Sequence, residues 1–180
     1  GGVFYPDYFG KDFVLNDLTH DGGLTAIRIE GPTNSVDQRV NRLSKELGLL
    51  DQELSILDSE QSNIFWSRTK NLEVFKSLKS NLLRIVLPMS ETLQVIQKLK
   101  NFEIKYFIDW GGGLIWASFD QLNTKILSEI KDTVKKHQGY ITLIKVEEDL
   151  KASADIFTID PIKYKISEKI KRSFDPKRIF

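Results

Sequence analysis

The chain has 180 residues, 41% of them hydrophobic, which suits a single domain with a sizeable core. Its 26 basic and 25 acidic residues leave a net charge of +1, so composition favours neither a nucleic-acid nor an anionic-membrane partner. The absence of cysteine excludes disulfides, zinc–thiolate sites, cysteine nucleophiles and iron–sulfur ligation by this chain, and it fits a cytoplasmic protein.

The two chain ends and the hydropathy profile indicate the cellular location of the protein and whether it is a fragment, and say little about its fold. No apolar run approaches the roughly 18 residues of a membrane helix, and no signal-peptide pattern opens the chain. The chain begins with Gly1-Gly2-Val3 and stops at the apolar Arg178-Ile179-Phe180. We therefore expect a fragment of a longer protein.

The first part of the chain predicts a short strand near residues 3–5, a loop, and an alternating strand over 24–30. A helix opens after Pro32, keeps apolar residues at helical spacing, and ends at Gly48. A short strand is then predicted over 54–57. Asp58 with Gln61 forms a capping-box pattern for a helix that runs to about Lys70.

The second part alternates strands and helices more clearly. Strands are predicted over 82–87, 104–108, 114–119 and 140–146. Ser90 is the predicted cap of a helix that runs through Leu99, and Asp120 that of a long helix closed before Gly139. The carboxylates at 147–149 indicate a solvated loop. Asp160-Pro161 starts a basic helix to about Phe174, whose isoleucines at helical spacing predict docking by that face.

Residues 82–146 therefore predict a βαββαβ, ferredoxin-like unit within an α+β fold. Residues 23–27 and 113–117 match, and the helices that follow end at glycines with nearly the same offset, which indicates two related halves. We expect one antiparallel sheet covered by helices. Residues 1–81 would form a first ferredoxin-like half without its opening strand and helix, and 82–180 the second half plus the C-terminal helix.

Three glycines interrupt the stretch Ile108–Trp116, IDWGGGLIW, and raise three alternatives. A phosphate-binding loop is disfavoured because the glycines lead into a strand and no lysine follows. An RNA-recognition strand fits at Gly113, Trp116 and Phe119 but lacks the basic residue and the first aromatic of that pattern. A hairpin turn beside a ligand is the third alternative.

Few residues indicate catalysis. His20 and His137 stand alone in the sequence, without a metal-binding His pair, and are expected to be surface or capping residues. Arg28 and Arg84 instead lie among apolar strand residues, where a charge requires a carboxylate or a ligand. Trp66 and Arg68 form a second aromatic–basic pair within a predicted helix.

Several blocks together resemble a known family. Residues 172–180, RSFDPKRIF, resemble the C-terminal signature of FAD-linked oxidases of the vanillyl-alcohol-oxidase type. The pairs and blocks FW at 65–66, LRIVLP at 83–88 and IDWGG at 108–112 are similar to blocks of the FAD-binding subunits of glycolate oxidase. The strand at 24–31 is similar to another such block.

The resemblance implies a C-terminal cap domain that covers the flavin ring and shapes the substrate pocket, with most of the FAD held by an N-terminal domain outside this chain. It implies oxidation of a 2-hydroxy acid by hydride transfer to the flavin. Arg84 would bind the substrate carboxylate, with Arg68 and Trp66 as further substrate-binding candidates. The candidates for contact with the flavin are Asp109, Trp110, Trp116 and Phe180.

The resemblance assigns no catalytic residue and no metal ligand. It further implies a complex with a second flavin subunit and an iron–sulfur subunit, in the cytoplasm or peripheral to the inner membrane through those partners, without nucleic acid. The missing histidine base favours an accessory subunit, and we expect the fragment alone not to retain FAD. The alternative hypothesis is a stand-alone ferredoxin-like binding module that reads RNA or senses a ligand.

Overall fold

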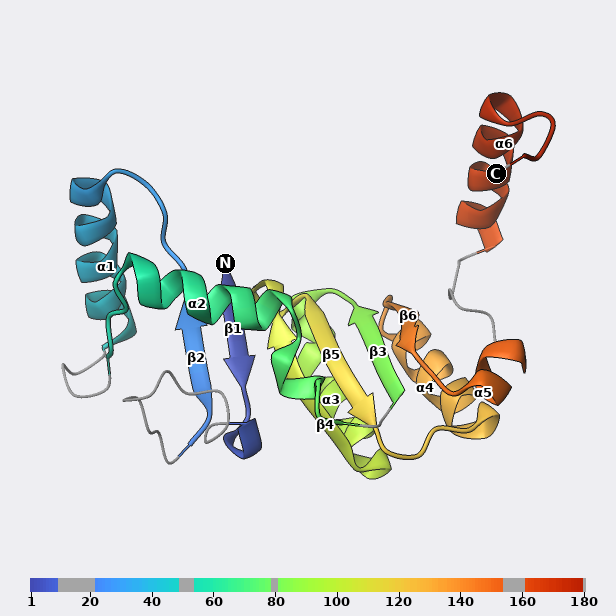
Figure 1. Ribbon diagram of the computed structural model, residues 1–180, viewed down its shortest axis with the longest axis horizontal. Coiled ribbons are helices and arrows are strands. Elements are labelled where there is room, and N and C mark those ends of the chain that lie inside the picture. Colours follow the sequence, from blue (N-terminus) through green and yellow to red (C-terminus); the bar gives the residue numbers. More distant parts are fainter. Residues whose placement is uncertain (10–21, 49–53, 79–80, 154–160, 180) are drawn as a thin grey trace.

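The computed structural model describes residues 1–9, 22–48, 54–78, 81–153 and 161–179. Its centre is a six-stranded antiparallel sheet in the order β2-β1-β4-β5-β3-β6 (Figure 1). The strands are β1 Gly2–Tyr5, β2 Leu24–Ile27, β3 Asn81–Val86, β4 Ile104–Asp109, β5 Leu114–Phe119 and β6 Tyr140–Lys145.

The helices lie on both faces of this sheet and beyond its ends (Figure 1). They are α1 Thr33–Leu47, α2 Ser59–Lys70, α3 Thr92–Leu99, α4 Thr124–Lys136, α5 Glu148–Ser153 and α6 Pro161–Phe174. Short 3-10 turns connect them: η1 Asp7–Phe9, η2 Glu73–Phe75, η3 Met89–Glu91, η4 Lys100–Phe102 and η5 Trp110–Gly112. The expected α+β fold, an antiparallel sheet covered by helices, is confirmed.

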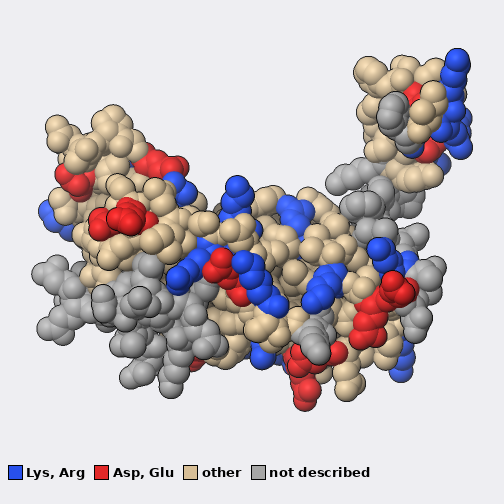
Figure 2. All heavy atoms as spheres, viewed as in Figure 1, with Lys and Arg blue, Asp and Glu red and all other residues tan. Residues whose placement is uncertain are grey.

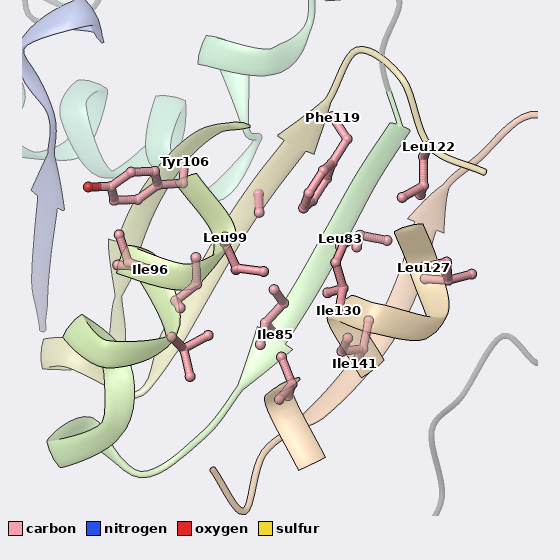
Figure 3. Close-up of a cluster of buried hydrophobic side chains, with 14 of the residues drawn as sticks. Leu83, Ile85, Ile96, Leu99, Tyr106, Phe119, Leu122, Leu127, Ile130 and Ile141 are labelled. Carbon is pink, nitrogen blue, oxygen red and sulfur yellow. The ribbon is translucent and has the colours of Figure 1, made fainter. Parts of the chain in front are cut away.

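The strands β4, β5, β3 and β6, together with α3 and α4, make the expected βαββαβ unit. Side chains alternate between the faces of a strand, so Leu83 and Ile85 of β3 point to one side of the sheet and Arg84 to the other. The residues on the first side pack with α3 and α4 into the larger core. Figure 3 shows Leu83, Ile85, Leu99, Ile130 and Ile141 meeting in this layer.

The opposite face carries a smaller, aromatic core beneath α2. Tyr5 of β1, Phe65 of α2 and Phe107 of β4 are each at most 4% exposed and pack with Phe9 and Phe75. Helix α2 crosses the front of the sheet in Figure 1, whereas β5 and β3 run clear of it. The strands β1 and β4 pair at one described position, Phe4 with Ile108. The side chains of the aromatic core therefore also help to hold β1 against β4.

Capping patterns predicted two helix ends correctly. The Asp58 carboxylate accepts from the Gln61 N–H at 2.8 Å, and the Gln61 side chain accepts from the Asp58 N–H at 3.2 Å, so the capping box of α2 is complete. Gly48 ends α1 in the left-handed conformation with φ of 64°.

Other predictions were wrong at the element ends. Residues 54–57, predicted as a strand, form none, and Leu57 packs against the aromatic core. Ser90 lies within η3, so α3 starts at Thr92 without a side-chain cap. Asp120 caps nothing, since the chain runs on through the buried Leu122 to Asn123, whose side chain accepts from the Ile126 N–H at 2.9 Å.

The C-terminal segments also differ from expectation. The predicted loop at 147–149 is largely helical, as Glu148 opens α5. The expected docking of α6 by its isoleucines is not seen against the described sheet: Ile162, Ile166 and Ile170 are 70%, 53% and 54% exposed, and Figure 1 shows α6 standing away from the sheet. Along the described ranges, no helix combines the length and the apolar character needed to cross a membrane.

Candidate functional site

A row of cross-strand neighbours runs over the open face of the sheet. Phe107 of β4 lies opposite Trp116 of β5, which lies opposite Arg84 of β3, which in turn lies opposite Thr142 of β6. The rings of Phe107 and Trp116 are stacked at 6.5 Å, and Trp116 is half-buried. The row leads from the aromatic core outward to the charge of Arg84, where α2 no longer covers the sheet (Figure 1).

The turn Trp110–Gly112 places a second indole over that charge. The guanidinium carbon of Arg84 lies 4.9 Å from the centre of the Trp110 ring, a cation–π contact. Trp110 is 58% exposed and has φ of 55°, a left-handed conformation that is unusual for a bulky residue. The largely exposed indole of Trp110 therefore lies against the Arg84 guanidinium.

The surrounding residues fix this turn. The Asp109 carboxylate accepts from the Trp110 N–H at 2.7 Å, and the Thr92 hydroxyl donates to the Gly112 carbonyl. Gly111 and Gly112 have φ of 63° and 114°, which an L-residue rarely adopts. The structure shows the hairpin turn of the third alternative for IDWGGGLIW, since the glycines join the antiparallel β4 and β5.

Arg84 differs in its partners from Arg28, which the sequence placed within a strand but which follows β2. Arg28, just beyond β2, pairs with Glu30 at 2.7 Å, which is the ordinary way of satisfying such a charge. Within the described residues, no carboxylate lies within 4.0 Å of the Arg84 guanidinium, although its side chain is half-buried. Arg84 thus offers hydrogen-bond donors in the plane of its guanidinium, with one of its faces against Trp110.

The structure brings Arg84, Trp110 and Trp116 together, with Asp109 beside them. Trp66 lies on α2, where its ring contacts Phe65 edge-on at 5.3 Å and the end of the indole lies 3.8 Å from the position of a Cβ on Gly1. It belongs to the border of the aromatic core. Phe180, the remaining candidate, lies outside the described residues, as does His20.

Arg68 has other surroundings. Its Nε lies 3.8 Å from a Glu73 carboxylate oxygen, and it lines a cavity of about 500 Å³ with Tyr8, Lys105 and residues of the η2 segment. The sequence grouped Arg68 with Arg84 as substrate-binding residues, but none of these contacts of Arg68 involves Arg84. Figure 2 shows Lys and Arg side chains spread over the middle of this face with fewer Asp and Glu among them.

His137 is not isolated, although the sequence predicted so. It ends α4 as the capping residue, and its Nδ1 lies 2.6 Å from a Glu91 carboxylate oxygen. Its Nε2 lies 2.9 Å from Lys98 Nζ. Both partners come from the η3–α3 segment, so sequence spacing held no signal for this cluster. Because each ring nitrogen is engaged, the cluster ties α4 to α3 and leaves His137 no free nitrogen for catalysis.

Two tyrosines, the buried Tyr5 and the exposed Tyr8, join neighbouring segments through their hydroxyls. Tyr5 Oη donates to Thr69 Oγ1 at 2.9 Å, and burial raises the pKa of the Tyr5 hydroxyl above its ordinary value. Tyr8 Oη donates to the Tyr106 carbonyl at 3.0 Å and accepts from the Tyr106 N–H at 2.8 Å. Tyr8 thereby satisfies β4 at a position where β1 does not pair with it. Neither hydroxyl is exposed as a proton donor to a ligand.

The arrangement can bind a planar or anionic ligand. A half-buried guanidinium beside two indoles supplies donors for a carboxylate and a flat surface for an aromatic ring. Among the described residues no group of three or more His, Asp or Glu side chains could hold a metal ion. No protein-family model matches the chain, and no curated protein matches it significantly.

Proposed function

We propose that this chain is the cap domain of an FAD-linked oxidoreductase subunit that oxidises a 2-hydroxy acid, and that Arg84 binds the substrate carboxylate. The observation that carries the proposal is the half-buried Arg84, stacked on Trp110 without a carboxylate partner among the described residues. A buried or half-buried charge without a partner is costly unless a ligand supplies one. The motif resemblance at 83–88, 108–112 and 172–180 supports the same function.

The residues on this face fit one side of a flavin ring. Trp116 is half-buried beside Arg84, and a Cβ added to Gly111 would meet nothing within 4 Å, so a planar ring system can approach the residues of this turn and strand. They offer no cradle for the pyrophosphate, which the proposal assigns to another domain of the full-length protein. The bound flavin supplies the hydride acceptor.

The residues of the chain orient the substrate. The planar guanidinium of Arg84 matches a carboxylate by two parallel hydrogen bonds, which fixes the direction of the substrate relative to the sheet. Trp110 limits the positions that the guanidinium can take and excludes water from one of its faces. The proposal gives Trp116 the role of a floor beneath the bound ring, with Asp109 holding the turn of Trp110.

The proposal extends to the assembly. A second flavin subunit and an iron–sulfur subunit would accept the electrons, with the chain as an accessory subunit peripheral to the inner membrane through these partners. A reading frame that extends upstream by about 150–200 residues, the length of another domain, and encodes a glycine-rich FAD-binding segment would support this. A start codon just before Val3 would contradict it.

The experiment compares two arginine variants in the full-length, FAD-loaded protein. Arg84→Ala is expected to lower kcat/KM for the 2-hydroxy acid about ten- to a hundredfold, because a charge-assisted contact contributes about 1.5–3 kcal/mol. Arg28→Ala, the matched control at the edge of the sheet, is expected to leave kcat/KM unchanged. Equal kinetics for both variants would remove the role proposed for Arg84.

A second candidate function is binding of single-stranded RNA, favoured by the half-buried Trp116 and Arg84 side by side on the two central strands of a ferredoxin-like unit. Bases would then stack on Trp116 and Trp110 while cationic side chains contact the phosphates. The affinity for RNA would fall with increasing salt, because salt screens the phosphate contacts. Salt-sensitive binding of a single-stranded RNA that is lost in Trp110→Ala would favour this candidate over the oxidase.

A further inference from the structure

The cavity beside Arg68 is separate from the row that carries Arg84. Its volume of about 500 Å³ falls within the range of small-molecule sites. Three stretches that are distant in sequence line it: η1, the end of α2 with the following residues 73–78, and the start of β4. The lining residues are Tyr8, Phe9, Arg68, Glu73, Val74, Ser77, Leu78 and Lys105.

The charges around this cavity favour an anion. Arg68 and Lys105 line it together with one carboxylate, that of Glu73. Glu73 is already engaged by Lys76, whose Nζ lies 3.2 Å from its Oε1. Arg68 reaches the second oxygen of Glu73 only through Nε at 3.8 Å, too long for a hydrogen bond. The two terminal nitrogens of Arg68 and the ammonium of Lys105 therefore retain donors within the described part of the chain.

Part of the cavity wall is apolar. The buried ring of Phe9 and the half-buried side chains of Val74 and Leu78 line the cavity together with the two cations. The Tyr8 ring forms a rim that does not move freely, because its hydroxyl is bound twice to the backbone of Tyr106. An apolar wall beside two cations suits a ligand with an apolar body and a single anionic head.

We propose that this cavity is a binding site for a small carboxylate with an aromatic or branched apolar body. The carboxylate lies between the terminal nitrogens of Arg68 and Lys105 Nζ, and the body lies against Phe9, Val74 and Leu78. A carboxylate suits the planar end of Arg68, which can give it two parallel hydrogen bonds. The site does not depend on the function proposed for Arg84.

The test is an NMR titration of the isotope-labelled 180-residue chain with three probes of one shape: phenylacetate, phenylacetamide and phenyl phosphate. Phenylacetate is expected to shift the resonances of Tyr8, Val74 and Leu78 in a saturable manner. Equal binding of phenylacetamide would overturn the role of the charge. Tighter binding of phenyl phosphate would overturn the carboxylate as the ligand class, and no saturable shift with phenylacetate would overturn the site.

Variants of residues inside and outside the cavity test whether phenylacetate binds there. Arg68→Gln and Lys105→Gln are each expected to weaken phenylacetate binding about tenfold or more. Glu73→Gln removes the competing carboxylate and is expected to tighten it, a result that loss of folding cannot produce. Arg28 pairs with Glu30 and does not line the cavity, so Arg28→Gln is the matched control with unchanged affinity. Loss of binding in Arg84→Gln but not in Arg68→Gln would move the ligand to the other site and overturn the proposal.

Discussion

Single residues define the candidate site through conformation as much as through charge. Trp110 holds a left-handed backbone conformation that costs an L-residue roughly 1–2 kcal/mol. In return its indole covers Arg84, a contact worth about 0.5–1 kcal/mol at an exposed position. The strain exceeds this one contact, so the other hydrogen bonds of the turn also hold Trp110 in this conformation.

This balance predicts an unusual order of stability at position 110. Trp110→Gly is expected to be more stable than Trp110→Ala by about 1 kcal/mol, because glycine adopts the left-handed conformation without a steric penalty. The measurement is the free energy of unfolding from denaturant titration. An alanine variant as stable as the glycine variant would show that the turn relaxes and that Trp110 is not strained.

The hydroxyl of Tyr5 makes stability sensitive to alkaline pH. Because burial raises its pKa, the folded chain holds this proton more tightly than the unfolded chain, where the tyrosine pKa is about 10. Its contribution is complete below pH about 10 and is lost as the pH rises toward the folded-state pKa. Each group of this kind lowers the unfolding free energy by up to about 1.4 kcal/mol per pH unit.

Tyr5→Phe is therefore expected to flatten the fall in unfolding free energy above pH about 10, while costing about 1 kcal/mol at neutral pH through the lost bond to Thr69. Exposed Tyr164→Phe is the control, with an unchanged alkaline slope. The measurement is denaturant unfolding at several alkaline pH values, and an unchanged slope in Tyr5→Phe would contradict burial of that hydroxyl.

At the scale of elements, close packing joins α4 and β6 to the end of β3. A Cβ on Gly139 would lie 2.7 Å from Val134 Cγ1 and 2.8 Å from the Val86 carbonyl oxygen. Gly139→Ala is expected to lower the unfolding free energy by about 1–3 kcal/mol, as overpacking does. Gly22→Ala, with nothing within 4 Å of its added carbon, is the control. Equal melting temperatures for the two variants would contradict this packing.

The sequence predicted elements where the local signal is strong. The Asp58 and Gln61 pattern marked the start of α2 because both hydrogen bonds of the box are local. Ser90 and Asp120 were misleading because a 3-10 turn and a buried leucine came between them and the helices. Residues 54–57 had a strand pattern, but whether a segment pairs depends on an available sheet edge, which is a tertiary property.

The site was only partly predictable for the same reason. Arg84 stood out as a charge among apolar strand residues, and the antiparallel register brings Trp116 beside it. The approach of Trp110 depends on the backbone angles of the glycine turn, which spacing does not encode. The cavity at Arg68 and the His137 cluster join segments far apart in the chain. No local sequence pattern predicts contacts of this kind.

At the scale of the whole molecule, two cores of different composition lie on the two faces of one sheet. The aliphatic core beneath α3 and α4 holds the four-stranded unit, whereas β1 and β2 extend it through the aromatic core and a single residue pair with β4. Hydrogen exchange is expected to show the greatest protection at Ile85 and Ile115 and the least in β2. Uniform protection across all strands would contradict this division.

The central claim is that Arg84 binds the carboxylate of a 2-hydroxy acid on the open face of the sheet. The most direct test measures kcat/KM of the full-length, FAD-loaded protein for a 2-hydroxy acid and for its neutral 2-hydroxy amide. The wild-type protein is expected to prefer the acid about ten- to a hundredfold, and Arg84→Ala is expected to abolish that preference. A preference for the acid that survives in Arg84→Ala would contradict the account.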